Sequence, residues 1–451
     1  MASERTEPEA SSFVPPRGAR QRHGSIDRLG VPEITGRLAR ERATQVLKAP
    51  RSPEPSAGGR SASTRLKSAV IMPCVAVALL IGGAVVAGPG DSSASTAGSL
   101  VGNVQAGSGI HLSSLNGRTF GIRGAIHVLT FGGPHLSVQI ALAHHAVDGG
   151  RQTPVTMCRA TVGCVAAINA DYFDLTRRGI PDPGDAVGGI VQNCVLLHTP
   201  EISHQQADLD NQTVSQGLNW GAAIDAGGVI VPITAVNQEL PMSYANVHVP
   251  LAGTLLYSAP YALALPTGAN RLTDEFTYAQ GLPLPTTINT TTPLEYVGQT
   301  ESPVRVGPGR VDVSVEVGSP LASLQVGQAV TLTTTSTSGC DNIGGHPVLI
   351  NHGVPVPVSP TDTYMTKPYA RTVIGWTSSG DTVIVVVDGK DGVSGATAAQ
   401  LTKVLESLNV VTALNLDGGV SSTLYAEGRV VNRPTHRRPR PVSTALLVVR
   451  S

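Results

Sequence analysis

The stretch from residue 371 to residue 416 limits the fold most narrowly. The segment "RTVIGWTSSGDTVIVVVDG" predicts two strands joined by a Ser-Ser-Gly-Asp turn, and the second strand is apolar on both faces, which is typical of a strand in the middle of a sheet. The segment "GATAAQLTKVLESLNV" predicts a helix with Thr397 as its N-cap. Four side chains form the apolar stripe of this helix: Leu401, Val404, Leu405 and Leu408. Because the strand "VTALNL" and a hairpin turning at Glu427-Gly428 follow, we expect an α+β domain.

The composition extends this prediction to the rest of the chain. The 451 residues include 50 glycines and 33 prolines, and only 4% are aromatic, which favours short strands and many turns over helical bundles. We therefore predict mixed, mostly antiparallel sheets with few helices, although the segment from about 200 to 310 indicates only irregular β structure. Lysine plus arginine equals aspartate plus glutamate at 32 each, so no overall field favours a nucleic-acid partner.

Two further segments each predict two strands joined by a turn. "AIHVLTFGGPHLSVQIALA", from 125 to 143, indicates two strands around a turn at Gly132-Gly133-Pro134. "HPVLINHGVPVPV", from 346 to 358, indicates a hairpin around His352-Gly353. Both predictions add antiparallel strands to the expected domain.

The N-terminal part of the chain differs from this average. Residues 1–67 are rich in arginine, proline, serine and glutamate, and they predict a disordered tail. Residues 68–88 carry no charge over roughly the twenty residues that a membrane-spanning helix needs. Arg60, Arg65 and Lys67 precede this run, so the positive-inside rule places the tail in the cytoplasm.

The expected organisation follows from these segments. Residues 1–67 are a cytoplasmic tail, 68–88 a transmembrane signal anchor, 89–109 a flexible linker and 110–451 an extracytoplasmic domain, which makes the chain a single-pass protein of the cell membrane. A signal peptide cleaved near Val85-Val86-Ala87 is the alternative and would give a secreted protein. The long leader before the apolar run argues against it.

The cysteines agree with an exterior location. Outside the apolar run the chain has Cys158, Cys164, Cys194 and Cys340, an even number that predicts two disulfides with three connectivities open. Free buried thiols are the alternative. No Cys-x-x-Cys pair or paired-histidine spacing accompanies them, so we expect no cofactor, and a divalent metal is left open.

Candidate site residues follow apolar strands at the points where those strands end. Loops after strands are where sites usually assemble on a rigid scaffold. Four such groups stand out: Asn169, Asp171, Tyr172 and Asp174 in "INADYFD"; Arg371 in "RTVIGW"; Asp388 in "VVVDGKDG"; and Asp417 with Ser421 and Ser422 in "NLDGGVSS". We interpret Asp388 as a turn former. A turn alone does not explain why Asp417 stands with Asn415, Gly418, Gly419 and the sequence Asn432-Arg433-Pro434, so this group predicts a ligand site.

Other catalytic templates fail. "GGVSS" and "DGVSGA" lack the second glycine of a nucleophile elbow, and neither a phosphate-binding glycine loop nor a zinc-peptidase helix is present. The remaining histidines lack ligand spacing, and we interpret each as satisfied or exposed: His144, His145, His198, His204, His346 and His352.

Four segments, "CVAAINADYFD", "NIGGHPVLINHGVPV", the run from 371 to 434, and "RPVSTALLVV", resemble the phosphodiester glycosidase family. The resemblance implies a hydrolase outside the cytoplasm that acts on an α-N-acetylglucosaminyl phosphodiester. It also implies a set of site residues: Asn169, Asp171, Arg371, Asp417, Gly418, Gly419, Ser421 and Arg433. The chain departs from the family pattern at Val420, His436 and 438–441, and the last two changes add positive charge.

A mechanism follows from these residues. Arg371 is expected to hold the phosphate through the N–H groups of its guanidinium. Asp417 is the first candidate, and Asp171 the second, for the carboxylate that stabilises the oxocarbenium ion or activates water. Gly418 and Gly419 would let backbone N–H groups approach an oxyanion. We expect further substrate contacts from the neighbouring polar residues: Tyr172, Asn415, Ser422 and Asn432.

The expected partners are a phosphodiester-linked glycan and the membrane. Two other functions remain open at this point. One is a catalytically degenerate protein that binds glycans or organises the cell envelope, and the other is a phosphodiesterase that cleaves the P–O bond.

Overall fold

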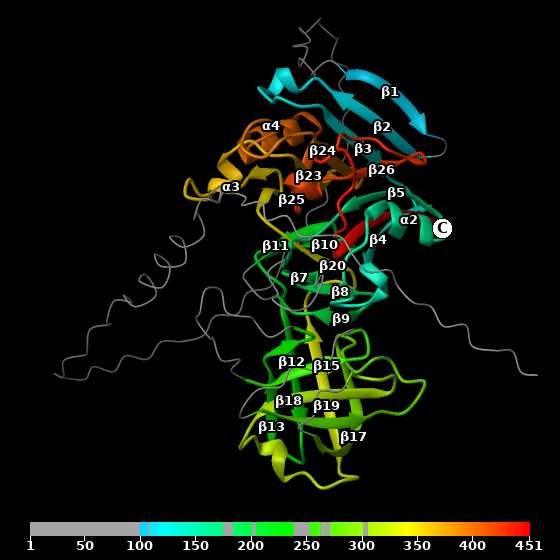
Figure 1. Cartoon of the computed structure of the whole chain (residues 1–451), viewed down its shortest axis with the longest axis vertical. Coiled ribbons are helices and arrows are strands. Elements are labelled where there is room, and N and C mark those ends of the chain that lie inside the picture. Colours follow the sequence, from blue (N-terminus) through cyan, green and yellow to red (C-terminus); the bar gives the residue numbers. More distant parts are fainter. Residues whose placement is uncertain are drawn as a thin grey trace, which may run out of the picture. The chain divides into compact units, whose positions relative to one another are not determined.

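The computed structural model (Figure 1) describes 100–106, 109–174, 184–200, 204–238, 253–261, 265, 271–300 and 305–451. These residues belong to one compact unit, 91–451. The predicted tail, 1–67, and the predicted membrane helix, 68–88, lie outside the described residues. Among the residues that are described, no helix is long and apolar enough to span a membrane.

The described chain is built from antiparallel sheets and a few short helices, as the α+β prediction requires; a single strand pair, β14 with β15, is parallel in the described part. The α-helices are α2 (Pro154–Ala160), α3 (Thr363–Thr366) and α4 (Ala398–Ser407). The 3-10 helices are η1 (Gly117–Phe120), η2 (Ala143–His145), η4 (Pro320–Ser323) and η5 (Gly419–Ser421).

The first sheet contains the stretch from 371 to 416. Its strands, in spatial order, are β1 (Leu100–Ala106), β2 (Ile110–Leu115), β3 (Ile126–Phe131), β24 (Thr382–Val387), β23 (Arg371–Thr377), β25 (Val410–Asn415), β21 (Val348–Asn351) and β22 (Val354–Pro355). Every residue of β24 is buried, and the strand lies between β3 and β23, which confirms the prediction of a central strand. Strand β1 falls within the predicted linker, 89–109, so regular structure begins before residue 110.

Helix α4 covers one face of this sheet (Figure 1). Leu401, Val404 and Leu405 pack in one core with Val373 and Val385. Thr397 caps the helix as predicted: its hydroxyl accepts from the N–H of Gln400, and the Gln400 side chain accepts in turn from the N–H of Thr397. The other face of the sheet packs on the second sheet in a separate core.

The second sheet carries the strand that ends at Asn169. Its order is β27 (Arg429–Val430), β26 (Leu424–Ala426), β5 (Cys164–Asn169), β28 (Thr444–Arg450) and β4 (Leu136–Leu142). Strands β26 and β27 form the predicted hairpin, and both turn residues, Glu427 and Gly428, have positive φ. The predicted hairpin around His352-Gly353 is also present, as β21 and β22. Strands β3 and β4 are adjacent in sequence yet join different sheets, so the turn at 132–134 connects the two layers.

Three further sheets hold the middle of the described chain. A two-stranded sheet pairs β6 (Phe173–Asp174) with β7 (Asp185–Ala186). Of the other two, the smaller contains β11 (Thr213–Ser215), β10 (Gln205–Asp208), β20 (Asn342–Gly345), β8 (Ile190–Gln192) and β9 (Val195–His198). The larger contains β13 (Ile230–Ile233), β12 (Trp220–Asp225), β19 (Ala329–Ser336), β17 (Thr290–Thr300), β16 (Arg271–Thr277), β18 (Arg310–Glu316), β15 (Leu255–Ser258) and β14 (Ala235–Val236).

The larger sheet corrects the prediction of irregular structure between 200 and 310. Strand β17 alternates inward and outward side chains, but a threonine takes one of the inward positions beside Leu294 and Tyr296. When threonine occupies some of the inward positions, the alternation of apolar and polar residues that indicates a strand is not visible in the sequence. The regular strands of this region were missed for that reason.

The four cysteines form two disulfides, as expected. Cys158 pairs with Cys164, which joins α2 to β5, and Cys194 pairs with Cys340 across 146 residues of sequence. The structure therefore selects one of the three connectivities that the sequence left open.

Candidate active site

The ends of β5 and β25 meet, although the two strands belong to different sheets. The backbone N–H of Asp417 donates to the carbonyl of Ala170 at 2.9 Å. The side-chain amide of Asn169 donates to the backbone carbonyl of Asp417 at 2.7 Å. Its Oδ1 atom accepts from the Thr372 hydroxyl and from the backbone N–H of Thr423. Asn169 is fully buried, and its hydrogen bonds hold the backbone of Asp417 in place.

The carboxyl of Asp417 is half-buried, and this position disfavours its ionised form. Its Oδ1 atom accepts from the N–H of Gly418 at 2.8 Å, and the Ser421 side chain also bonds the carboxyl. Loss of hydration raises the pKa of Asp417 to about 6. The bonds from Ser421 and Gly418 and the charge of Arg440 oppose this rise in pKa, and the nearby carboxylate of Asp171 adds to it.

The two glycines after Asp417 permit a close approach of Tyr364. A Cβ atom on Gly418 would lie 2.8 Å from the Tyr364 hydroxyl and 2.7 Å from the Ala370 carbonyl, and Gly419 has a φ of 58°. The N–H of Gly418 bonds to Asp417 and that of Gly419 to Ala370. Both N–H groups are therefore occupied, and the expectation that they face an oxyanion is wrong for this structure.

Asp171 is the second carboxylate and is held rigidly. It is 1% exposed, its Oδ1 accepts from the N–H of Tyr172, and its Oδ2 accepts from the N–H of Gly188. A Cβ atom on Gly188 or on Gly344 would lie 2.3 or 2.5 Å from Oδ2, so only glycines fit there. Asp171 contributes a fixed negative charge behind the site.

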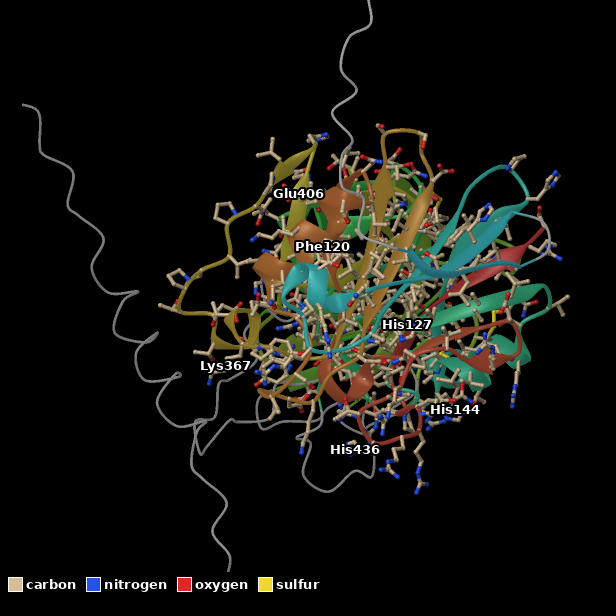
Figure 2. All side chains as sticks on the ribbon, turned by 90° about the horizontal axis from the view of Figure 1, so that it is seen from above. Phe120, His127, His144, Lys367, Glu406 and His436 are labelled. Carbon is tan, nitrogen blue, oxygen red and sulfur yellow. A yellow bond between two sulfur atoms is a disulfide. The ribbon has the colours of Figure 1, made fainter. Side chains whose placement is uncertain are left out.

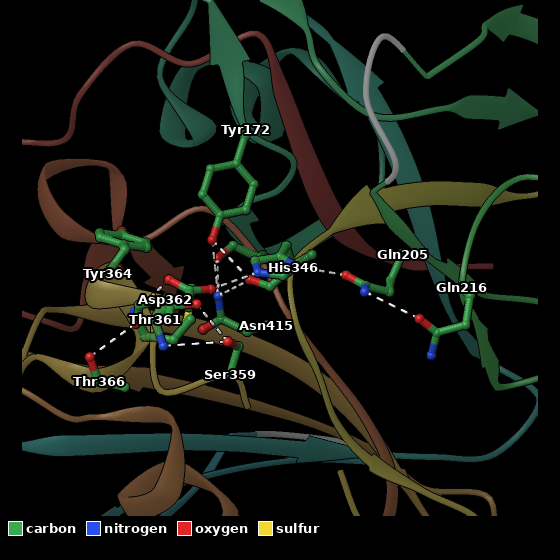
Figure 3. A network of polar contacts seen from close by, with 12 residues as sticks. Tyr172, Gln205, Gln216, His346, Ser359, Thr361, Asp362, Tyr364, Thr366 and Asn415 are labelled. Carbon is green, nitrogen blue, oxygen red and sulfur yellow. Dashed lines mark hydrogen bonds and ion pairs between the residues drawn. The ribbon is translucent and has the colours of Figure 1, made fainter. Parts of the chain in front are cut away.

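Tyr172 and Asn415 connect this carboxylate to the segment around His346 (Figure 3). The Tyr172 hydroxyl donates to the carbonyl of His346 at 2.9 Å, and Asn415 donates to the same carbonyl at 2.7 Å and to the Tyr172 hydroxyl at 3.2 Å. Burial raises the pKa of Tyr172 well above its usual value, so the phenol stays protonated. The Asn415 Oδ1 atom is buried without a hydrogen-bond partner in the described part of the chain.

Several residues of this cluster were not predicted from the sequence. The ring of His346 lies between Gln205 and Asp362, at 2.8 Å from Oε1 of the former and 2.9 Å from Oδ2 of the latter (Figure 3). It stacks on His204, whose Nδ1 lies 3.6 Å from Oδ1 of Asp171. Tyr364 and Arg440 are the others. They come from four segments far apart in sequence, 204–205, 346, 362–364 and 440, and the sequence contains no spacing that could have joined these segments.

Arg371 does not take the predicted position. It is fully buried, and its guanidinium donates to the carbonyls of Ala396, Tyr364 and Lys367 and to the sulfur of Met365. The rings of Tyr364 and Tyr369 lie against it, with centroids 4.6 and 5.3 Å from its central carbon. The guanidinium therefore supports Tyr364 and is enclosed by protein groups that occupy its donors.

The remaining predicted residues separate into two groups. Asn432 and Ser422 are structural: the Asn432 side chain bonds the N–H of Leu424 and the carbonyl of Ser422. Arg433 is exposed, and its N–H donates to Asp388 at 2.7 Å. Asp388 also lies 3.2 Å from His127 of β3, so it connects that strand to the loop that carries Arg433 in addition to following β24.

Among the described residues, no group of three or more histidine, cysteine, aspartate or glutamate side chains lies close enough together to hold a metal ion. The chemistry of the cluster is that of carboxylates, phenols and imidazoles. A half-buried carboxyl that titrates near neutral pH, beside a second fixed carboxylate, suits proton transfer or stabilisation of a developing cation.

Comparison with known proteins shows similarity to one family over part of the chain. Residues 289–449 match the phosphodiester glycosidase family. The N-acetylglucosamine-1-phosphodiester alpha-N-acetylglucosaminidase of Bos taurus is 35% identical over 86 residues, which are 18% of this chain and 16% of the bovine protein. The chain thus matches only a small part of that relative's length.

Two solved structures share the fold. A hypothetical protein from Synechocystis has a TM-score of 0.58 at 19% identity and covers 76% of this chain and 62% of its own. A putative exported protein from Burkholderia pseudomallei has a TM-score of 0.57 at 16% identity and covers 75% and 74%. The similarity to the phosphodiester glycosidase family is therefore seen in sequence, and the fold is shared with these two bacterial proteins.

Proposed function

We propose that this chain is a hydrolase that releases a sugar, N-acetylglucosamine in the first instance, from a phosphodiester-linked glycan. The proposal includes an anchor at residues 68–88 that holds the enzyme in the cell membrane with its catalytic domain outside. The observation that carries the reaction is the carboxyl of Asp417, whose pKa is raised to about 6 beside the fixed charge of Asp171. The family match supports the choice of a sugar phosphodiester as substrate.

Asp417 is the reacting group in this mechanism. Water adds to the anomeric carbon, the bond from that carbon to the phosphate oxygen breaks, and the phosphate monoester leaves with the bridging oxygen. A phosphate is a good leaving group, so the reaction needs little help from a general acid. The ionised Asp417 either stabilises the oxocarbenium ion or takes the proton of the attacking water.

Arg440 replaces Arg371 as the phosphate-binding residue. It is half-buried, its charge acts on Asp417, and one of its nitrogens donates to the Ser421 hydroxyl at 3.2 Å. Its side chain lies over the ring of Phe173, with the central carbon 5.0 Å from the ring centroid. An arginine has five N–H donors, so this one hydrogen bond leaves most of the fork for phosphate oxygens.

The full-length chain, purified in detergent, tests the function. Given an α-N-acetylglucosaminyl phosphodiester of a simple alcohol in water labelled with oxygen-18, it is expected to release free sugar and an unlabelled phosphate monoester. Label in the phosphate would mean P–O cleavage and would contradict the proposed reaction. Binding of the diester without turnover would instead identify a glycan-binding protein that keeps the fold without the activity.

The pH profile tests the role of Arg440. Because Asp417 acts as the anion, kcat/KM is expected to rise with pH through about 6 and then level off. Arg440→Gln removes a positive charge that lowers the pKa of Asp417, so the rise should move to higher pH, by a few tenths to about one unit. Arg438→Gln, in the same loop and exposed, should leave the midpoint in place. A midpoint that moves to lower pH in Arg440→Gln would contradict the assignment.

A further inference from the structure

A cleft lies next to the proposed reaction centre. It has a volume of about 660 Å³, within the range of about 300–1,000 Å³ that is usual for ligand sites, and three loops line it, 123–125, 388–394 and 433–437. Figure 2 shows His436, one of its lining residues, at the edge of the molecule, where side chains that end in nitrogen gather. We call it the basic cleft.

The charges of the basic cleft are almost all positive and unpaired. Arg123, Lys390, Arg433 and Arg437 line it and are exposed, and none of the four makes an ion pair with any residue that the structure describes. Asp388 is the acidic residue of the lining, and its oxygens already bond His127 and the N–H of Arg433. A concave surface with this charge attracts anions and concentrates them.

The cleft adjoins the Asp417 site but is distinct from it. Thr435 lines the cleft, and its hydroxyl lies 3.2 Å from the carbonyls of both Gly419 and Gly389, so it forms part of the wall between the two. Asp417, Asp171 and Arg440 are not among the lining residues. An anion in the cleft would therefore lie beside the turn that follows Asp417, without contacting its carboxyl.

The other lining residues indicate which anion fits. Apart from the imidazole of His436 they are small or polar, without phenylalanine, tyrosine or tryptophan, so the cleft offers little surface on which nucleobases could stack. Its cations come from three separate loops, which suits several phosphate groups along a chain better than one compact ion. We propose that the basic cleft binds a flexible polymer with repeated phosphodiester groups.

Direct binding tests this proposal independently of the proposed function. The probe is poly(glycerol phosphate), and the measurement is its dissociation constant by fluorescence anisotropy at several salt concentrations, in the full-length Asp417→Asn variant so that no turnover occurs. The triple change Arg123→Gln, Lys390→Gln and Arg437→Gln is expected to weaken binding roughly tenfold or more. It should also lower the slope of log affinity against log salt by about one for each cation removed.

A matched control removes three exposed cations from other surfaces: Arg118→Gln, Arg305→Gln and Lys403→Gln. This variant should bind the polymer as the parent does, and thermal unfolding should show that both triple variants are folded. With Asp417 restored, the cleft variant should still hydrolyse a small sugar phosphodiester at the parent rate. That result would separate the cleft from the reaction centre.

Three results would overturn the proposal. Equal weakening in the control would mean a diffuse attraction to the whole surface. Inorganic phosphate that binds as tightly as the polymer would mean a site for a single ion. Tighter binding of a single-stranded oligonucleotide than of poly(glycerol phosphate) would assign the cleft to nucleic acid.

Discussion

Asp417→Asn is expected to lower kcat/KM for a sugar phosphodiester by roughly two to four orders of magnitude, the range for loss of a single catalytic group. Asparagine keeps the shape of the side chain and can still accept from the N–H of Gly418, so the turn should remain in place. Only the charge is lost. A steady-state assay of sugar release measures the effect, and a rate equal to that of the wild type would remove Asp417 from the mechanism.

The same substitution is expected to stabilise the protein at neutral and alkaline pH. The pKa of the Asp417 carboxyl is about 6 in the folded chain against a usual value of 3.8, so the unfolded chain loses this proton first as the pH rises. The wild type therefore loses stability between about pH 4 and pH 7, by an amount on the order of 1–3 kcal/mol. Asparagine does not titrate and avoids that loss.

Denaturant unfolding at two pH values measures this second effect. Asp417→Asn and wild type should be about equally stable near pH 4, and the variant should be the more stable near pH 8. The opposite order at pH 8 would mean that the ionised carboxyl makes a net favourable interaction in the folded protein. A gain in stability together with a loss of activity is the signature of a functional carboxyl placed in an unfavourable environment.

Arg371→Ala is expected to destabilise the fold by roughly 2–5 kcal/mol, the range for truncation of a large buried side chain to alanine. The substitution removes the guanidinium donor from three carbonyls, those of Ala396, Tyr364 and Lys367, and opens a cavity beneath Tyr364. Denaturant unfolding should show the loss directly, and activity should fall with the folded fraction. Arg433→Ala, at an exposed position, should change stability by no more than about 0.5 kcal/mol.

This pair of variants separates a buried structural arginine from an exposed one. If Arg371→Ala kept the stability of the wild type and only raised KM, the guanidinium would have to reach the substrate, contrary to its enclosure by Ala396, Tyr364 and Lys367. The position of Arg371 at the start of β23 made it a reasonable candidate from sequence. Its direction into the protein is set by α3 and by the loop before Ala396, which no local pattern encodes.

The sequence alone determined the features that depend on near neighbours along the chain. The capped helix α4, the buried strand β24 and the two hairpins follow from periodicity, capping and turn residues, all of which act within about ten positions. The location of Asp417 at the end of a buried strand belongs to the same class, since the apolar run before it and the two glycines after it are contiguous.

Only the tertiary structure decided which of these ends meet and what each side chain contacts. The approach of Asn169 to Asp417 joins two sheets across 248 positions, and the stacking of His204 on His346 joins two further loops. The pairing of Cys194 with Cys340 is equally remote in sequence. Contacts at this separation depend on how whole sheets pack, because the energy that selects them comes from the shared core and from buried polar groups that must find partners.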